Sequence, residues 1–535
     1  MLHALAPLLI FTLLTATAAW PVLTRLDSVI VGNDQDVYIN PWADMWTLRA
    51  LRDPGRSLWF TDLLFYPHGA DLHFHSFSHL TTAISLALRP LFGSLPAYNL
   101  AVLVHVVLVG VAMFHFARYL SDSALAGLLA GIVFAFNSHT IWQTAHPVLV
   151  SIWPLPWAAL FLLQAMERRD SRCALAAAFF VFLAALCSTL MLILTALWLA
   201  FILLFALAAG RLRRPALPAL ALFAIASAAL VAVPLYPLLT EALLHSNTSF
   251  VIDAGPSVPT DALAPLRPYW SGLLARSLHF GAVPIGLLLA ALFRLRKTWP
   301  WFLFLVVVYL FAIGPHPVVG GVEANVILPW SNLVRPLLRH THRLNVLLSA
   351  ALAVLVGYGW TVVASRLQSK RWQHWLLAAT LGALIFAEYM IPPFPYRTPP
   401  VSAFYTAYLD NVPDDVALAI LPTGRQEDKL YMYYQTLHGH PMTGGVISRP
   451  QEDVFRFIRA NPLLRAAAVN WEPAPLPADF SPSLQELANA GVGYVVLEKT
   501  IFRRKGLDLA TWVQKMPFPA IYEDDRVVVF PTAPN

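Results

Sequence analysis

The chain has 535 residues, of which 58% are hydrophobic and only 12% are charged. Soluble domains carry roughly a quarter charged residues, and several apolar runs here reach the ~20 residues that span a bilayer. The composition therefore excludes an ordinary soluble protein and predicts an α-helical polytopic membrane protein. The net charge of +6 lies in short basic clusters between apolar runs, which excludes a nucleic-acid-binding surface.

The first predicted element is an apolar helix within residues 2–24. Its leading residues MLHALAP contain no Lys or Arg, and no small-residue cleavage site stands out in AAWPVL. A secretory signal peptide has both a basic leading region and a small-residue cleavage site. We therefore expect this segment to be a retained first helix.

An acidic segment, Asp34-Gln35-Asp36, follows the first apolar run. After it, Trp42 and Trp46 recur at helical spacing, which places both indoles on one face of a helix over 41–53. Because Trp favours the membrane–water boundary, this pattern predicts a juxtamembrane helix lying on the bilayer, directly after the two carboxylates.

Basic clusters set the expected membrane topology. By the positive-inside rule they lie in the cytoplasm, so an even number of crossings separates one from the next. The clusters are at 168–172, 211–214, 294–297 and 366–371. The predicted spans are the first helix, 98–118, 122–140, 148–167, two within 173–209, 216–238, 278–293, 299–314, 343–365 and 373–391.

The segment 78–93 is short and contains Arg89 and Pro90, so we predict an amphipathic helix in the outer interface instead of a crossing. The total becomes about eleven transmembrane helices, with the N-terminus cytoplasmic and the C-terminus extracytoplasmic. All long loops and the tail then lie on the outer side. This one-sided distribution of polar residues argues against a transporter or flippase, which would place functional charges near mid-membrane.

The tail, roughly residues 395–535, is more highly charged than the rest of the chain. Strand-like runs occur at 416–422, 493–498 and 526–531, and a helical stretch at 483–491 lies between them. The alternation predicts a C-terminal extracytoplasmic α/β domain with a mixed sheet. The expected division is a transmembrane domain over 1–394, with its long first outer loop at 23–97, and a soluble domain over 395–535.

With these features, the chain resembles the GT-C superfamily of membrane glycosyltransferases. Members have a first helix followed by a long outer loop with a DxD-like acidic motif, here Asp34-x-Asp36. A bacterial branch, often grouped with lipid-linked-sugar transferases, has an Asp followed four residues on by Asn and six on by Trp, here Asp36, Asn40 and Trp42. Further segments similar to that branch are FYPHGADL (65–72), LFGSLPAYNL (91–100), 337–359 and YYQTLHGHPMTGGVISR (433–449).

The resemblance implies transfer of a sugar, hexosyl or related, from a polyprenyl-phosphate carrier to an acceptor on the outer face of the membrane. An acceptor hydroxyl is a poor nucleophile, so a carboxylate must take its proton as the new bond forms. Asp36 is the candidate general base. Asp34 would assist it, orient the acceptor or hold a divalent cation, Mg²⁺ or Mn²⁺. The alternative is that both are solvated turn residues.

A cationic group lies at the outer end of the predicted 343–365 span and contains Arg339, His340, His342 and Arg343. Arg339, Arg343 and His340 are the candidate donor-phosphate ligands, because forked Arg donors match phosphate and stabilise a departing one. Lipid headgroup anchoring is the alternative role for the two arginines.

Candidate substrate-binding residues are His146, Trp42 and Asn40. His146 lies in a short outer turn where superfamily members often carry an acidic functional residue; the alternative is an interfacial histidine with no special role. His68, Asp71, His73 and His75 match no defined zinc spacing, so a structural role is favoured for them. Glu241 and Glu323 are outer-loop carboxylates that could contact the acceptor.

Three functions remain open at this stage. A polyprenyl-phosphate-sugar glycosyltransferase of a bacterial inner membrane is favoured. A non-catalytic relative that binds or assembles lipid-linked glycan is the second, and it would tolerate loss of Asp36. A transporter or flippase is the third.

Overall fold

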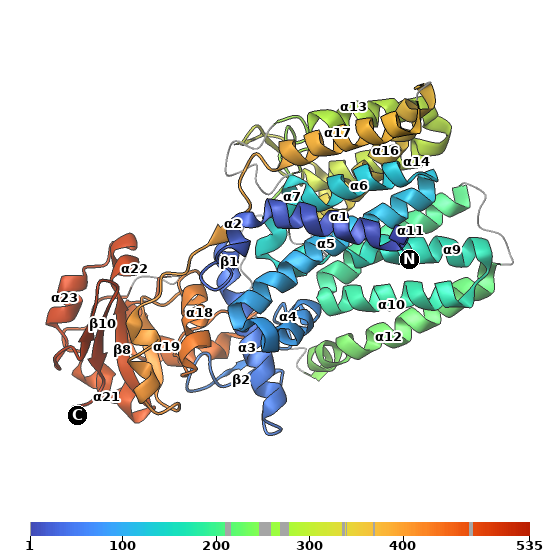
Figure 1. Ribbon diagram of the computed structural model, residues 1–535. Coiled ribbons are helices and arrows are strands. Elements are labelled where there is room, and N and C mark those ends of the chain that lie inside the picture. The colour runs from blue at the N-terminus through green and yellow to red at the C-terminus, as the bar shows by residue number, and fades with distance from the viewer. Residues whose placement is uncertain are drawn as a thin grey trace. The chain divides into compact units, whose positions relative to one another are not determined.

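Figure 1 shows the computed structural model of the protein. It describes residues 2–208, 216–244, 258–267, 278–333, 338, 340–367, 370–469 and 474–534. The chain forms two compact units. The first unit contains 1–33, 77–236 and 255–397, and the second contains 34–76, 237–254 and 398–535.

The first unit is built from helices. They are α1 (Leu2–Ala18), α2 (Trp20–Leu23), α4 (His79–Phe92), α5 (Ser94–Ser121), α6 (Ala124–Phe136), α7 (Ser138–Trp142), α8 (Pro147–Val150), α9 (Pro154–Arg168), α10 (Ser171–Cys187), α11 (Thr189–Ala208), α12 (Leu217–Leu244), α13 (Ala282–Ala291), α14 (Leu295–Ala312), α16 (Asn345–Arg366) and α17 (Arg371–Tyr389). The C-terminal end of α12 belongs to the second unit. Short strand pairs join β1 (Ile30–Val31) to β6 (Tyr396–Arg397) and β4 (Val318–Val319) to β5 (Val322–Glu323).

Helix α16 lies at the centre of the first unit, and every residue from Asn345 to Trp360 is buried. Helices α5 and α6 pack directly against each other, backbone to backbone. A Cβ atom on Gly127 would lie 2.6 Å from the carbonyl oxygen of Phe114, and one on Gly131 would lie 2.7 Å from that of Gly110. Glycines at this spacing therefore allow the close helix contact.

The described residues contain six helical stretches that are long and apolar enough to cross a bilayer, or seven if the bent pair 124–136 and 138–145 is one span. They are 94–121, 147–168, 189–208, 217–244, 282–312 and 341–366. The protein is thus a multi-pass membrane protein. Residues 282–312 form one apolar stretch, whereas the sequence predicts two spans there. The count of about eleven and the topology stay predictions.

The second unit combines helices with a four-stranded sheet. Its elements are the 3₁₀ helix η1 (Gln35–Tyr38), α3 (Ile39–Arg52), β2 (Phe60–Thr61), β3 (Ala70–Asp71), β7 (Ala417–Leu421), α18 (Asp428–His438), α19 (Arg456–Ala460), α20 (Pro462–Ala466), α21 (Ser481–Asn489), β8 (Val492–Glu498), α22 (Lys499–Arg504), α23 (Leu509–Gln514), β9 (Tyr522–Glu523) and β10 (Val527–Pro531). The strand order is β7-β8-β10-β9. Strands β7 and β8 are parallel and the other pairs antiparallel, which makes the predicted mixed sheet.

Two carboxyl groups are buried inside this second unit. Glu498 ends β8, is 4% exposed, and its Oε1 accepts a hydrogen bond of 3.0 Å from the hydroxyl of Tyr405. Burial raises the pKa of Glu498 to about 8 and that of Asp428 to about 7. At neutral pH the folded chain therefore keeps a proton on Glu498, and partly on Asp428, that it would release on unfolding. Their titration therefore lowers stability as the pH rises from about 4.5 to 8.

Replacing Glu498 by Gln tests this pH dependence, because Gln keeps the shape and the acceptor oxygen but cannot ionise. We expect the Tm values of the wild type and Glu498→Gln to be closest near pH 5. Between pH 5 and about pH 8, the Tm of the variant should rise relative to that of the wild type. Each pH unit in that window is worth up to about 1.4 kcal/mol. Thermal unfolding of the full chain in detergent measures it. Parallel Tm curves for the two proteins would show that Glu498 is ionised in the fold.

Candidate active site

The acidic segment forms a tight turn at the start of the second unit. Asp34 precedes η1, and its Oδ1 accepts a hydrogen bond of 3.4 Å from the backbone N–H of Asp36. The side-chain amide of Asn40 donates at 3.1 Å to the backbone carbonyl of Asp36. Of the predicted site residues, the structure thus brings Asp34, Asp36 and Asn40 together in one turn at the N-terminal end of α3.

Lys429 of α18 forms an ion pair with Asp36. Its Nζ lies 2.5 Å from Asp36 Oδ1, and it also donates to Oε1 of Gln426 at 3.0 Å. The Lys429 side chain is 8% exposed, whereas that of Asp36 is 36% exposed. A neighbouring ammonium favours the ionised form of a carboxylate, and solvent can reach the Asp36 side chain. Lys429 could not be identified from the sequence, because nothing in a sequence shows which cation faces a carboxylate so far away along the chain.

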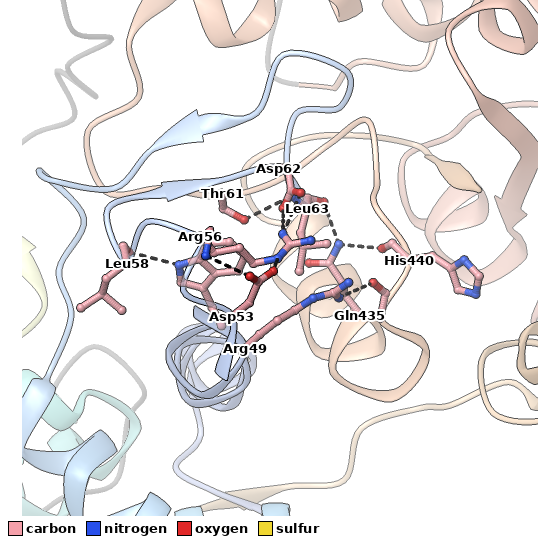
Figure 2. A network of polar contacts seen from close by, with 12 residues as sticks. Arg49, Asp53, Arg56, Leu58, Thr61, Asp62, Leu63, Gln435 and His440 are labelled. Atoms are coloured by element: carbon pink, nitrogen blue, oxygen red, sulfur yellow. Dashed lines mark hydrogen bonds and ion pairs between the residues drawn. The ribbon is translucent and has the colours of Figure 1, made fainter. Parts of the chain in front are cut away.

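Helix α3 packs on α18, and Trp42 joins the two helices. The indole N–H of Trp42 donates at 2.6 Å to Oε1 of Gln435, whose amide donates at 2.7 Å to the carbonyl of Leu63 and at 2.8 Å to that of His440. Figure 2 shows Gln435 between these two carbonyl-bearing segments. Trp42 and Trp46 stack with ring centroids 6.1 Å apart, and both are buried.

The expectation that these indoles lie at the membrane–water boundary is therefore wrong. Periodicity shows which face of a helix is apolar but not what covers it, and here protein covers it. The side chain of Trp42 is 0% exposed. If Trp42 contributes to substrate binding, it does so by fixing the position of α3 and not by touching the substrate.

A second polar network fixes the loop after α3 (Figure 2). Both carboxylate oxygens of Asp62 accept from the guanidinium of Arg56, at 2.6 and 2.7 Å, and Asp53 accepts from its Nε at 3.1 Å. Arg49 donates at 3.1 Å to the carbonyl of Gly439, just beyond α18. Hydrogen bonds from the side chains of Arg49 and Gln435 to backbone carbonyls thus hold the first loop on the tail. Such bonds leave no apolar pattern in the sequence from which they could be predicted.

In the first unit, Asn99 of α5 fixes the chain that leads to the acidic segment. Its Oδ1 accepts from the N–H of Val31 at 3.0 Å, and its amide donates to the carbonyls of Leu26 and Val29 at 2.9 and 2.7 Å. Asn99 is fully buried. One side chain therefore satisfies three backbone groups of this loop, and sequence analysis gave it no role.

Gly32 and His146 also belong to the first unit. Gly32 has φ +106°, and a Cβ atom there would lie 2.5 Å from Cα of Ala145, so only glycine fits. His146 follows Ala145, is partly buried, and precedes α8 in the predicted turn between helices. Asp34 follows Gly32 by two residues in the chain.

The cationic group lies at the start of the stretch 341–366. Arg339 is outside the described residues. His340 Nδ1 accepts from the N–H of Val258 at 3.1 Å, and Arg343 Nη1 donates to the carbonyl of Leu338 at 3.0 Å. The N–H of Arg343 donates to the carbonyl of His340 at 3.3 Å, so these two predicted donor-phosphate ligands share one turn.

A neighbouring histidine extends this group. The ring of His342 lies 6.2 Å from that of His139, which follows α6 and which sequence analysis did not select. The spacing in the sequence gave no sign of this contact.

A divalent cation at Asp34 and Asp36 would meet hard oxygen ligands, as Mg²⁺ and Mn²⁺ prefer. One oxygen of Asp34 already accepts from a backbone N–H, and one of Asp36 already binds Lys429. These two side chains alone supply too few ligands for an octahedral ion, so water or substrate would have to complete the set.

Comparison with known proteins gives a likeness of structure alone. No model of a protein family and no curated protein sequence matches the chain. The arabinofuranosyltransferase AftD from Mycobacteria matches with a TM-score of 0.59 at 15% identity, over 100% of this chain and 40% of AftD. ArnT from Cupriavidus metallidurans, solved with undecaprenyl phosphate, matches with 0.57 at 13% identity over 97% of both chains.

The archaeal oligosaccharyltransferase AglB from Archaeoglobus fulgidus, in complex with an inhibitory peptide and a dolichol-phosphate, matches with a TM-score of 0.50 at 13% identity. It is covered over 71% of its length, by 96% of this chain. All three are glycosyltransferases of one superfamily. The chain therefore shares the fold of the GT-C membrane glycosyltransferases that its sequence resembles.

Proposed function

We propose that this protein transfers a sugar from a polyprenyl-phosphate carrier to an acceptor on the outer face of the bacterial inner membrane. The observation that carries the proposal is the likeness to ArnT over 97% of both chains, because that structure holds undecaprenyl phosphate. AglB with a dolichol-phosphate supports the same class of donor. The chain spans only 40% of AftD, so AftD adds support for the fold and none for an acceptor.

In the proposed reaction, Asp36 takes the proton of the acceptor hydroxyl as its oxygen bonds to the anomeric carbon. The bond from that carbon to the carrier phosphate breaks, and the phosphate leaves with the electron pair. The carboxylate of Asp36 is 36% exposed, so an acceptor can reach it. Lys429, bound to Oδ1, acts as a positioning residue that fixes the carboxylate.

The departing phosphate gains negative charge in the transition state, so nearby cations lower the barrier. Arg343 and His340 share one turn at the beginning of the 341–366 stretch and are the proposed phosphate ligands, together with Arg339. A forked Arg donor suits this task, because a phosphate can accept two parallel hydrogen bonds from it.

The variant Asp36→Asn keeps the side-chain shape and removes the base. We expect kcat/KM for sugar transfer to fall by about 10²- to 10⁴-fold. The matched control is Asp62→Asn, which breaks another ion pair of the first loop at an exposed position and should stay within about twofold of wild type. The measurement is transfer of radiolabelled sugar from a panel of polyprenyl-phosphate donors in membranes with equal amounts of each protein.

Equal activity of Asp36→Asn and wild type would remove Asp36 from catalysis and make Asp34 the next candidate. If the wild type transfers sugar from no donor in membranes that supply the acceptors, the alternative function is favoured, that of a non-catalytic protein that binds or assembles lipid-linked glycan.

Lys429→Met tests the positioning role. Removing the ammonium raises the pKa of a neighbouring carboxylic acid, so the acidic limb of the pH–rate profile should move to higher pH. We also expect kcat to fall by roughly tenfold as the carboxylate loses its fixed orientation. Lys429→Arg restores the charge and should restore the profile, which a mere loss of folding would not do. An unmoved acidic limb in an active, folded Lys429→Met variant would contradict the role of Asp36 as the base.

A further inference from the structure

The second unit contains a cluster of three side chains of the kinds that ligate metals, outside the acidic turn. Asp71 ends β3, His73 follows two residues later, and Glu241 lies near the C-terminal end of α12. His73 Nδ1 is 2.8 Å from Asp71 Oδ2 and 3.9 Å from Glu241 Oε2. One ligand atom from each residue lies within 4.8 Å of the others. We propose that Asp71, His73 and Glu241 bind a divalent transition-metal ion such as Zn²⁺.

The arrangement of charges favours an ion over a hydrogen-bonded cluster. The same nitrogen of His73 faces both carboxylates, but it can carry only one proton, and 3.9 Å is too long for a hydrogen bond to Glu241. Two carboxylates close to one imidazole repel each other, and a cation between them relieves this repulsion. A divalent ion offsets both negative charges.

The distances also fit. With bonds of about 2.1 Å, the ligand atoms of a tetrahedral zinc ion lie roughly 3.4 Å apart. The two measured distances from His73 Nδ1, 2.8 and 3.9 Å, fall on either side of that value. Shifts well under 1 Å would therefore bring His73 Nδ1 to this spacing from Asp71 Oδ2 and from Glu241 Oε2. Imidazole nitrogen with carboxylate oxygen is a donor set that suits Zn²⁺ and related ions.

The surrounding structure holds two of the ligands in place. Asp71 is paired with Phe60 across the β2–β3 hairpin, and its Oδ1 accepts from the backbone N–H of His73 at 2.9 Å. The indole of Trp59 stacks on the His73 ring, with centroids 5.4 Å apart and planes inclined by 16°. Contacts of this kind orient a ligand before the metal binds.

A pocket of about 330 Å³ gives access to the cluster. Asp71 and Glu241 line it, together with His68, Asp453 and Arg456. An ion and its remaining water ligands could enter from this side, as a functional metal site requires.

Sequence analysis favoured a structural role for this histidine-rich stretch, and for two of its histidines the structure shows such contacts. His75 accepts through Nδ1 from the N–H of Ser448 at 3.2 Å, and the ring of His68 packs edge-on against Phe457. Only His73 joins the cluster. The third ligand, Glu241, comes from a distant helix, so no local spacing could reveal the set.

Zinc binding to the full chain in detergent tests the proposal without any activity assay. After removal of metal with EDTA, the protein is equilibrated with Zn²⁺ and desalted. Bound zinc is then counted by mass spectrometry and the affinity is measured by calorimetry. We expect His73→Gln and Glu241→Gln each to bind one zinc fewer per chain than wild type, or to bind it at least about 100-fold more weakly.

The matched control is His316→Gln, which alters an exposed His–carboxylate pair, 3.7 Å from Glu323, and should bind zinc as wild type does. Asp36→Asn should also retain this zinc, which separates the site from any cation at the acidic turn and makes the result independent of the proposed catalysis. Equal zinc binding by wild type and both ligand variants would overturn the proposal. Loss in His73→Gln alone would overturn the three-residue site, since Glu241 would then be no ligand.

Discussion

The ion pair between Asp36 and Lys429 is the interaction that joins the candidate base to the body of the second unit. Lys429 is nearly buried, and a buried ammonium needs a partner. Its helix, α18, is anchored at both ends. Asp428 accepts hydrogen bonds from Thr423, Gly424 and Gly445 at its start, and Gln435 binds Trp42 in its last turn. The acidic turn is therefore positioned by a helix that cannot shift alone.

This anchoring gives a physical meaning to the tail motif at 433–449. Gln435, His440 and Gly445 supply hydrogen bonds that hold the first loop and the start of α18 in one body. The first loop contributes the carboxylates and the tail contributes their support. A glycosyltransferase that accepts its sugar from a lipid needs its base at a fixed position, because misplacement by 1 Å can cost about 100-fold in rate.

Much of the local structure could be predicted from the sequence. Long apolar runs indicated the helices of the first unit, and short strand-like runs in the tail indicated β7, β8 and β10. Strands β7 and β10 are buried at every position, as continuous apolar runs of this length predict. The helix over 41–53 corresponds to α3, but its surroundings were predicted wrongly. The contacts of Asn99, Lys429 and Gln435 could not be predicted, because each joins a segment far along the chain. Glu241 was a candidate acceptor contact, but its place beside His73 could not be predicted for the same reason. A contact made by a single polar residue produces no repeating pattern in the sequence.

The acidic turn shows the same limit on a small scale. The DxD pattern and its place after the first apolar segment indicated Asp34 and Asp36, and the structure puts them in one turn with Asn40. The DxD pattern could not indicate that Lys429 forms an ion pair with Asp36. The roles of Arg343, His340 and His146 rest on resemblance and position, and the side-chain hydrogen bonds described for His340 and Arg343 join backbone groups.

The most direct test of this account is the fate of the donor lipid. Wild-type protein in membranes that contain acceptors would be given a series of polyprenyl-phosphate sugars, and release of the sugar-free polyprenyl phosphate would be followed by mass spectrometry. The account predicts that at least one donor is consumed, with the sugar appearing on an acceptor in equal amount. Full recovery of every intact donor would contradict it.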